Sequence, residues 1–352
     1  MAKPKVLFIG GSLNQTTQLH AVAKSLQSDA DCFFSPYYGT GVFGWAARRR
    51  MLDRTIMGFG AFYDNSISYL TEHGLSIDEQ GRKHQNEYDL VVTGSDLFVQ
   101  HNIRNKPIVL VQEGMTDAEN FLYPIMKALK LPMCMTGNTA GTGLSDSYVK
   151  FCVASEGYKA KFIEKGVMPW KMVVTGIPNY DNAKTFENNS FPHRQFVLCA
   201  TTDMRETLKF ENRRATIEHA LSIAAGRPLI FKLHPNEHFD RAKSEIDRWA
   251  PGALVYQNDA NVHEMIACCD VLITQFSTVV YTGLALGKEV YSEFDLRELK
   301  ALTPLQNGGT SGDRIADVCR EVLQESLVRA GKRPASGLRA FSPQGPAFEA
   351  KA

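Results

Sequence analysis

Two short segments in the second half of the chain carry side chains that could bind a phosphate group. In the first, the strand-like run Phe231-Lys-Leu is followed by His234 and Pro235 and, two residues later, by Glu237. Because a proline stops a strand, His234 is expected at the carboxyl end of a parallel strand, where such folds bind their ligands. Its imidazole could donate to a phosphate or act as an acid. A turn histidine with only a capping role is the alternative.

The second segment places two hydroxyl groups where a helix is expected to begin. The strand-like run 270–274 is followed by Gln275, Ser277 and Thr278, and then by the apolar stretch 279–286. Backbone N–H groups, the helix dipole and both hydroxyls would converge on one anion at this point. An ordinary N-cap supplied by Ser277 or Thr278 is the alternative.

In the first half of the chain the candidate chemical group is a carboxylate. Glu113, in Gln112-Glu-Gly, follows the apolar run 107–111 and is expected at a strand end, where a carboxylate facing a cleft can take a proton from a hydroxyl group. A carboxylate that caps the next helix is the alternative. Asp96, in Thr93-Gly-Ser-Asp, stands at another strand end and is the reserve candidate.

These residues must be positioned by strands and helices, and the chain alternates between the two patterns. Apolar runs at 6–9, 32–35, 89–93, 107–111 and 171–175 predict parallel strands, because strands covered on both faces are apolar throughout. The alternation restarts at 196–200 and continues with strands at 228–233, 253–256 and 270–274. Helical patterns are found at 18–26, 121–131, 212–225, 238–249, 262–268, 279–286 and 315–328.

One polar stretch interrupts this alternation. We expect it to be a linker, residues 177–194, between a first domain at 1–176 and a second at 195–330. A tail rich in Gly, Pro, Ser and Ala, residues 331–352, is expected to be loose. The predicted fold is α/β, with two Rossmann-like doubly wound domains that face a cleft.

The composition is that of an ordinary globular chain. Its 352 residues suit two domains at roughly 150 residues each. A net charge of +1 and the lack of an aromatic-basic motif argue against nucleic-acid binding. The seven cysteines show no ligand spacing, so neither a zinc site nor a disulfide framework is expected. No stretch approaches the ~18 apolar residues of a membrane span. Together these features favour a cytoplasmic protein.

Residues 43–63 combine large apolar side chains with a basic flank. Apolar residues at 45, 52, 56, 59 and 63 follow helical spacing, and Arg48-Arg-Arg and Arg54 lie among them. Such a helix suits an anionic membrane surface, so peripheral contact with the inner face of the membrane is one hypothesis. A core helix with a solvated arginine flank is the alternative.

The order and spacing of the His-Pro and Ser-Thr segments resemble those of the donor-binding domain of GT-B glycosyltransferases. The most similar members pair a His-Pro motif with a Ser-Ser or Ser-Thr motif: bacterial sialyl- and Kdo-type transferases and CDP-glycerol glycerophosphotransferases. UDP-N-acetylglucosamine 2-epimerases share this architecture. The stretch Gly176-Ile-Pro-Asn-Tyr-Asp181 is also similar to the TG-x-P-x-x-D stretch that precedes the second domain in these families. The resemblance covers about residues 85–290 and implies an acceptor-side first domain and a donor-binding second domain.

The resemblance implies roles for individual residues. Glu113 matches an acidic motif at two of three positions and would be the general base of an inverting transfer. His234 would contact the donor phosphates or protonate the leaving phosphate, and Ser277 and Thr278 would hold that phosphate. The base and ribose would lie against the loop 256–261. The implied donor-binding residues are Gly11, Ser12, His234, Pro235, Glu237, Gln275, Ser277 and Thr278. No metal or other cofactor is implied, because GT-B relatives typically lack the Asp-x-Asp metal motif.

The implied function is a metal-independent transfer in surface polysaccharide or glycolipid synthesis. A glycosyltransferase, or a glycerophosphotransferase, would move a sugar or sugar-like group from a CMP-, CDP- or UDP-linked donor to a glycan or lipid-linked acceptor. A UDP-N-acetylhexosamine 2-epimerase is the first alternative, because Asp96, Glu113, Glu119 and His234 follow the order of that family's catalytic residues. Those epimerases place carboxylates after the serine that matches Ser277, and this chain has none there. A non-catalytic nucleotide-sugar binding protein is the second alternative.

Overall fold

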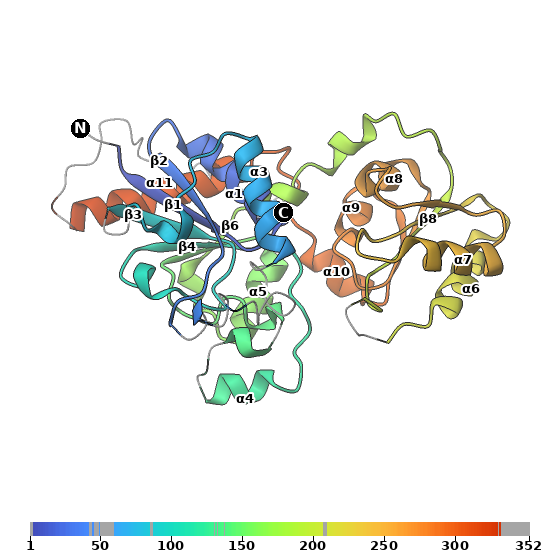
Figure 1. Ribbon diagram of the computed structural model, residues 1–352, viewed down its shortest axis with the longest axis horizontal. Helices are drawn as coiled ribbons and strands as arrows, with labels where there is room; N and C mark the ends of the chain where they lie inside the picture. Colours follow the sequence, from blue (N-terminus) through green and yellow to red (C-terminus); the bar gives the residue numbers. More distant parts are fainter. Residues whose placement is uncertain are drawn as a thin grey trace, which may run out of the picture. The chain divides into compact units, whose positions relative to one another are not determined.

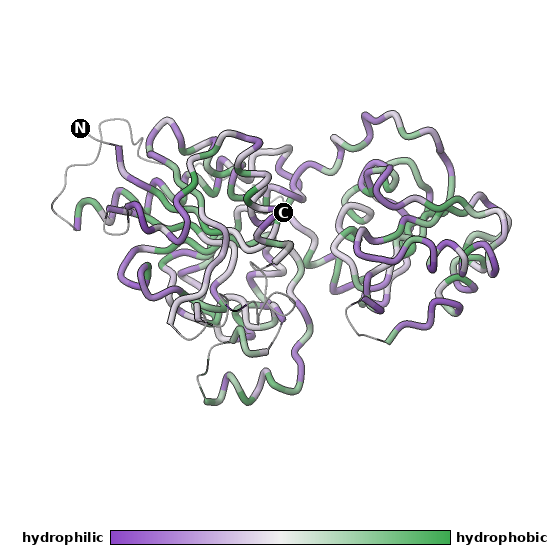
Figure 2. Tube along the Cα trace, in the orientation of Figure 1, coloured by the Kyte–Doolittle hydropathy of each residue, from purple (hydrophilic) through white to green (hydrophobic). Residues whose placement is uncertain are grey.

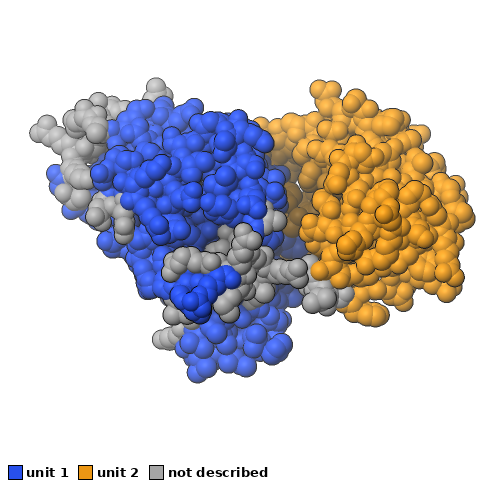
Figure 3. Space-filling view, in the orientation of Figure 1, with its two compact units in different colours: residues 1–153, 159–179, 310–352 blue, residues 154–158, 180–309 orange. Residues whose placement is uncertain are grey.

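The computed structural model divides the chain into two compact units (Figures 1 and 3). Unit 1 comprises Met1–Val153, Lys159–Asn179 and Thr310–Ala352, and unit 2 comprises Ala154–Tyr158 and Tyr180–Gly309. The structure describes residues 3–41, 44–45, 49, 60–84, 87–129, 131, 133–136, 138–206, 210–329 and 331. Most of the predicted membrane-contact segment, 43–63, and nearly all of the predicted tail, 331–352, therefore lie outside the described residues.

Unit 1 is built on a six-stranded parallel sheet with the order β2-β1-β3-β4-β5-β6. The strands have apolar side chains on both faces and are almost entirely buried, which is why they read as short continuous apolar runs in the sequence. Figure 2 shows the same runs as hydrophobic segments inside the unit. The strands are β1 (Lys5–Gly10), β2 (Asp31–Pro36), β3 (Tyr88–Thr93), β4 (Ile108–Val111), β5 (Lys150–Val153) and β6 (Met172–Val174).

The helices of unit 1 include two that share one hydrophobic core with the sheet. Leu19 and Val22 of α1 pack together with Ile315 and Val322 of α11 and with β1. A Cβ atom at Gly312 would lie 3.2 Å from the carbonyl oxygen of Ala21, so the two helices are close there. The helices are α1 (Leu13–Leu26), α3 (Ala61–Glu72), α4 (Tyr123–Ala128), α5 (Glu156–Lys165), whose first residues belong to unit 2, and α11 (Ser311–Arg329).

Unit 2 is built on a five-stranded parallel sheet with the order β11-β10-β7-β8-β9. Its core joins β7, β8 and β10 to the apolar faces of α6 and α7. The strands are β7 (Val197–Ala200), β8 (Leu229–Lys232), β9 (Leu254–Tyr256), β10 (Val271–Thr274) and β11 (Glu289–Tyr291). The helices are α6 (Arg213–Ala224), α7 (Phe239–Trp249), α8 (Val262–Cys268), α9 (Val280–Ala285) and α10 (Leu296–Leu302).

The observed division differs from the expected domain boundaries at two places. The last helix, expected in the second domain, belongs to unit 1, because its apolar face completes the core beside α1. The expected linker is largely part of unit 2: Phe186 stacks on His263 with ring centroids 4.8 Å apart. The segment that enters unit 2 also lies beside the segment that leaves it, since Gly308 N–H donates to the carbonyl of Asp181 at 2.9 Å.

No helix within the described residues is long and apolar enough to cross a membrane.

Candidate functional site

In each unit the order of the strands reverses beside the strand that starts the sheet. β1 has β2 on one side and β3 on the other, and β7 lies between β8 and β10. Connections leave such a strand pair on opposite faces, so a crevice opens at the carboxyl ends of the strands, where open α/β sheets bind ligands. Ile9, Thr93 and Leu110 are aligned in unit 1, as are Ala200, Lys232 and Thr274 in unit 2. The residues that follow these aligned positions are the candidates for a ligand-binding site.

The glycine-rich turn after β1 and Glu113 after β4 meet at the first turn of α1. Ser12 is the N-cap of α1: its Oγ accepts from the backbone N–H of Gln15 at 3.1 Å and donates to Glu113 Oε1 at 2.6 Å. Gln15 Nε2 donates to the other oxygen, Glu113 Oε2, at 2.7 Å, while its Oε1 accepts from Gly11 N–H at 2.6 Å. The structure therefore brings Gly11 and Ser12, predicted to bind the donor, together with Glu113, predicted to be the base.

Two glycines allow this close approach. A Cβ atom at Gly10 would lie 2.9 Å from Thr16 Oγ1, and one at Gly94 would lie 2.7 Å from Gln15 Cδ. Something must shift at contacts below 3.0 Å, so a larger residue at Gly94 would displace the Gln15 side chain, and one at Gly10 would displace the Thr16 hydroxyl. Gly94 thus leaves the space in which Gln15 reaches Glu113.

The environment of Glu113 raises its affinity for a proton. Burial raises the pKa of Glu113, while the hydrogen bonds from Ser12 and Gln15 lower it and only partly offset the effect of burial. The positive end of the α1 dipole also favours an anion at this place. A carboxylate with a raised pKa is a stronger base than an ordinary glutamate and can accept a proton from a hydroxyl group.

Asp96, the reserve candidate, is committed to the backbone of a loop. Its Oδ1 accepts from Gly143 N–H at 2.9 Å and its Oδ2 from Ser145 N–H at 3.1 Å. Asp96 is buried, and burial raises its pKa while these bonds lower it. Each carboxylate oxygen thus holds the loop that precedes β5, which is the work of a structural residue.

Sequence reasoning missed Gln15, although a signal was present. Ser12-Leu-Asn-Gln15 has the S-x-x-Q spacing of a capping box, in which the third helical residue reaches back over the N-cap. Here the amide of Gln15 reaches Gly11 and Glu113 instead of the N-cap N–H. The capping-box spacing could have indicated Gln15 as a functional residue. It does not indicate that the partner of Gln15 is Glu113, which is distant in the sequence.

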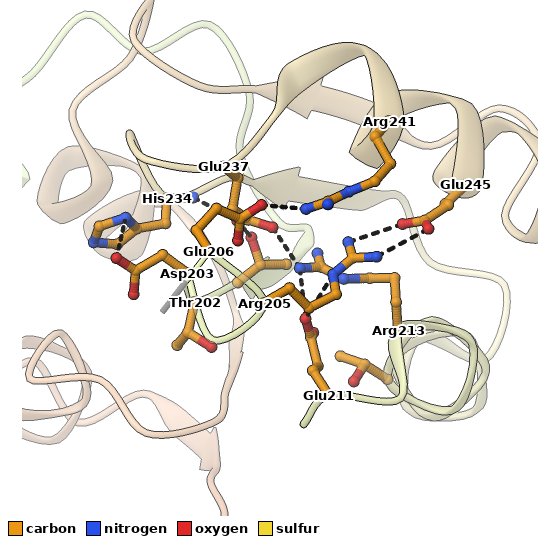
Figure 4. A network of polar contacts seen from close by, with 12 residues as sticks. Thr202, Asp203, Arg205, Glu206, Glu211, Arg213, His234, Glu237, Arg241 and Glu245 are labelled. Atoms are coloured by element: carbon orange, nitrogen blue, oxygen red, sulfur yellow. Dashed lines mark hydrogen bonds and ion pairs between the residues drawn. The ribbon is translucent and has the colours of Figure 1, made fainter. Parts of the chain in front are cut away.

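In unit 2 His234 follows the end of β8, and its ring faces the carboxylate of Asp203, which follows the neighbouring strand β7 (Figure 4). Its Nδ1 accepts from Asn236 N–H at 3.2 Å and lies 3.6 Å from Asp203 Oδ2, in the loop after β7. Asp203 also accepts from Asn236 Nδ2 at 2.8 Å. Because Nδ1 of His234 is an acceptor here, the neutral ring carries its proton on Nε2, which can donate to an anion.

Glu237 has a different place from the predicted one. We expected it among the donor-binding residues, yet its side chain is buried. Its carboxylate accepts from the backbone N–H of His234 at 2.8 Å, from Thr201 Oγ1 and from Arg213. These bonds fix the backbone of the His-Pro turn, so Glu237 can act on a ligand only through His234.

Glu237 is one end of a chain of ion pairs that ties the His-Pro turn to two helices (Figure 4). Arg213 pairs with both Glu237 and Glu211, and Arg205 pairs with Glu211 and, through two 2.9 Å hydrogen bonds, with Glu245. Burial raises the pKa of Glu211, and the two arginines oppose that rise. Removing one member of such a buried network leaves a charge without its partner, so the network holds the turn only as a whole.

A second clamp on the turn comes from the loop after β9. Gln257 Nε2 donates to the carbonyl of His234 at 3.1 Å and to that of Glu237 at 2.8 Å, and it lies 3.4 Å from the carbonyl of Pro235. The sequence predicted that the loop 256–261 lies near the donor, and the structure joins it to the His-Pro turn. Gln257 itself was not predicted, because no local pattern links it to residues 234–237.

The residues after β10 lie at the same sheet edge. Gln275 accepts from Thr202 Oγ1 at 3.2 Å and donates to Thr216 Oγ1 at 3.3 Å, so it bridges the end of β7 and α6. Thr278 Oγ1 accepts from Tyr180 Oη at 2.9 Å. Ser277 and Thr278 precede α9, as predicted, but that helix is short, Val280–Ala285. The structure thus joins Gln275 to Thr202, which lies with Asp203 in the loop after β7.

An Asp-x-Asp triplet does occur in the chain, away from these strand ends. Asp29-Ala-Asp31 leads into the amino end of β2, and Asp29 accepts from Arg320 Nε at 2.9 Å. Its carboxylate therefore belongs to an ion pair with α11. Within the ranges that the structure describes, no group of three or more His, Cys, Asp or Glu side chains is placed to hold a metal ion.

Comparison with known proteins gives similar folds but no sequence relatives. No family model matches the chain, and no curated protein matches it by sequence. A candidate UDP-N-acetylglucosamine 2-epimerase from Listeria monocytogenes is 16% identical, with a TM-score of 0.58 over 92% of this chain and 98% of the other. The Neisseria meningitidis UDP-GlcNAc 2-epimerase, bound to UDP-GlcNAc, is 11% identical, with a TM-score of 0.54 over 90% and 100%.

A third similar structure belongs to a different enzyme. A histidine-to-alanine variant of the wall teichoic acid polymerase TagF is 12% identical, with a TM-score of 0.52 over 93% of this chain and 91% of the other. At these identities the matches establish the fold alone: two α/β units of the GT-B type, each built on a parallel sheet. The predicted α/β class with two parallel-sheet units is confirmed, and the cleft between them stays a prediction.

Proposed function

We propose that this protein is a GT-B glycosyltransferase that moves a sugar or sugar-like group from a nucleotide-activated donor to a hydroxyl acceptor. Glu113 would take the proton of the acceptor hydroxyl as its oxygen attacks the donor carbon, and the bond to the leaving phosphate would break with inversion. His234 would donate from Nε2 to that phosphate, and the hydroxyls of Ser277 and Thr278 would hold it. Proton and leaving group are thus both accounted for without a covalent intermediate.

The observation that carries this proposal is the contrast between two carboxylates of unit 1. Glu113 sits at a strand end with a raised pKa and two side-chain donors, which suits a single general base. Asp96 has both oxygens bound to backbone N–H groups. A 2-epimerase would need the aligned acids Asp96 and Glu119 in addition to Glu113, whereas an inverting transferase needs one base.

The second candidate is a 2-epimerase acting on a UDP-linked sugar. It is favoured by the two similar structures named as UDP-N-acetylglucosamine 2-epimerases, one of them a candidate, and by the order of Asp96, Glu113, Glu119 and His234 in the chain. It is disfavoured by the segment after Ser277, Thr-Val-Val-Tyr-Thr-Gly, which has no carboxylate for ribose hydroxyls. Because this segment lacks that carboxylate, the proposal includes CMP- and CDP-linked donors as well as UDP-linked ones.

The acceptor and the location are part of the same proposal. We expect a glycan or lipid-linked acceptor, made in the cytoplasm or at the inner face of the membrane, in the synthesis of a surface polysaccharide or glycolipid. The structural matches include an enzyme named for wall teichoic acid, a polymer of that general kind. Contact with the membrane would then bring the protein to its acceptor.

Incubation with CMP-, CDP-, UDP- and GDP-linked sugars, with and without extracts of glycan and lipid-linked acceptors, tests the reaction. Release of nucleotide that depends on the acceptor supports transfer. An epimer that retains its nucleotide supports the second candidate and contradicts the first. Binding of a donor with neither product would leave a nucleotide-sugar binding protein and contradict both.

Three substitutions separate the two enzymes further. Glu113→Gln removes the base and should lower kcat by about 100-fold or more for a transferase. Glu119→Gln should leave a transferase unaffected but abolish an epimerase that depends on this acid. Glu164→Gln, an exposed acid on α5, is the matched control for both changes.

A further inference from the structure

Unit 1 contains a cavity whose described lining does not include Glu113. Its volume is about 680 Å³. Arg104, Ser145, Ser147 and Lys165 contribute to its wall, and they belong to segments that lead into β4, β5 and β6. Asp96 and residues 97–99, which follow the carboxyl end of β3, also line the cavity. Glu113, Ser12 and Gln15 are not among the described lining residues.

The charged side chains of the wall are mostly cationic. Arg104, Lys127 and Lys165 line the cavity, and the single carboxylate among the described lining residues is that of Asp96. Both oxygens of Asp96 already accept backbone N–H groups, so its charge is partly compensated by the loop at 143–145. The balance of the described wall favours an anion.

Lys165 is buried although it carries a charged group. Its Nζ donates to the carbonyl of Ala140 at 2.9 Å, and Lys127 Nζ donates to the carbonyl of Lys165 at 2.8 Å. Burial lowers the pKa of Lys165, and Glu119 and Asp117, which raise it, do not line the cavity. A bound anion would stabilise this ammonium group in place of the water that burial removes.

Much of the rest of the wall is apolar, and α4, which contributes Met126 and Lys127 to the wall, also has exposed apolar side chains at and near it. Met126, Leu131, Met133 and Leu144 line the cavity. Next to it, Phe121, Ile125 and Leu129 are spaced by four residues along α4 and its ends, and they are 80%, 47% and 64% exposed. Residues four apart share one helix face, and Ile125 lies in α4 with Leu129 as its C-cap, whereas Phe121 precedes the helix. Figure 2 shows α4 as a segment that carries hydrophobic residues.

From this combination we propose that the cavity of unit 1 binds an amphiphile that carries an anionic head, a phosphate or carboxylate on an alkyl chain. Arg104, Lys127 and Lys165 hold the head by charge-assisted hydrogen bonds, and the methionine and leucine side chains cover the first part of the chain. The remaining chain runs toward the exposed apolar side chains at and near α4. The site does not depend on the proposed function, because none of these residues belongs to the proposed reaction.

Calorimetric titration of the full-length protein with three probes tests both halves of the proposal. Dodecyl phosphate carries the head and the chain, inorganic phosphate only the head, and dodecyl maltoside a chain with a neutral head. Below the micellar concentration, dodecyl phosphate should bind about tenfold or more tightly than either of the others, since burial of two or three CH₂ groups is sufficient for that factor. Equal affinity for inorganic phosphate, or for dodecyl maltoside, overturns the proposal.

Variants place the binding at this cavity. Arg104→Gln with Lys127→Gln should weaken dodecyl phosphate binding by about tenfold or more through loss of charged donors. Ser147→Trp should have a similar effect by filling the cavity, although it removes no cation. Lys159→Gln is the control, because Lys159 lies on α5 and does not line the cavity.

Wild-type affinity in a folded Ser147→Trp variant contradicts the assignment, with folding checked by thermal unfolding. Loss of affinity in the Lys159→Gln control would show that only overall charge matters, and would overturn it as well.

Discussion

Glu113 is held by two neutral donors, and this arrangement tunes its proton affinity. Hydrogen bonds from Ser12 and Gln15 stabilise the ionised carboxylate, and burial opposes them with a larger effect. A cationic partner would have lowered the pKa much further and weakened the base. Neutral donors can orient the carboxylate without lowering its pKa as far as a cation would. A general base needs both a fixed orientation and a high proton affinity.

Gln15→Leu tests this balance. If Glu113 is the base, the rate falls as the pH falls through its raised pKa, because the protonated acid cannot accept a proton. Loss of the Gln15 donor destabilises the carboxylate, so the acidic limb of the profile should move to higher pH. The pH dependence of kcat with the active donor is the measurement. Asn14→Ala, an exposed neighbour on the same turn, is the control and should leave the limb in place.

His234 should contribute to nucleotide binding through a single hydrogen bond from Nε2. A charge-assisted bond of this kind stabilises a complex by about 1.5–3 kcal/mol, so His234→Ala should weaken binding of CMP, CDP or UDP by about tenfold or more. Titration calorimetry with each nucleotide measures it. His219→Ala, an exposed histidine on α6, is the control. Unchanged affinity in His234→Ala would show that the donor site lies elsewhere.

At the scale of elements, buried ions hold the His-Pro turn to the helices behind it. The turn after β8 is fixed by Glu237, which is bound in turn to Arg213 of α6, and further pairs reach Glu245 of α7. The turn therefore cannot shift unless two helices shift with it. This arrangement can preorganise His234 for an anion before any ligand arrives.

Glu237→Gln breaks this network and should cost stability. The substitution leaves the buried Arg213 without one of its two carboxylates, and such losses reach about 3–5 kcal/mol. Equilibrium denaturation in urea measures the change. Glu218→Gln removes an exposed pair with Arg214 at 2.7 Å and should change stability by less than about 1 kcal/mol. Similar effects of the two changes would contradict a special role for the network.

Local signals decided which elements the sequence could predict. Helix α8 was predicted at its observed limits, where Asn261 caps its first turn. Helix α1 was predicted to start at residue 18 and starts at Leu13, because Ser12 caps a first turn made of polar residues. Strand β5 was missed, since Lys150-Phe-Cys-Val is short and stands in a polar neighbourhood. The strand ends that carry Glu113, His234 and Ser277 were predicted correctly because apolar runs mark them.

At the scale of the whole molecule, contacts between distant residues were beyond the sequence. The pattern at 315–328 predicted a helix in the second domain, but not that this helix would pack beside α1 in unit 1. In the same way nothing local links Asp96 to Gly143, or Glu237 to Arg213. The periodicity of apolar residues indicates which side chains are buried, but it does not identify the distant residues that they contact. Asp96 and Glu237 were therefore predicted to face a ligand, whereas in the structure their carboxylates bind other residues of the same unit.

The return of α11 makes a prediction about truncation. A chain that ends at Gly309 loses Ile315, Val322, Leu323 and other residues buried in the core of unit 1. Each such side chain contributes about 1.5–3 kcal/mol, so their sum is comparable to the whole stability of a domain. Unit 1 should then be degraded in limited proteolysis. A chain that ends at Gly331 keeps α11 and should resist, and equal resistance of both chains would contradict this role.

The hydrogen bond between Gly308 and Asp181 has a consequence for how such a protein can change over time. The long segment Tyr180–Gly309 starts and finishes at neighbouring points, as an inserted domain does. It can therefore be replaced by recombination as one cassette, with both breakpoints falling in the same small region. A lineage could exchange the His-Pro turn and the residues after β10 in this way while it keeps the Glu113 turn and the core that α11 completes.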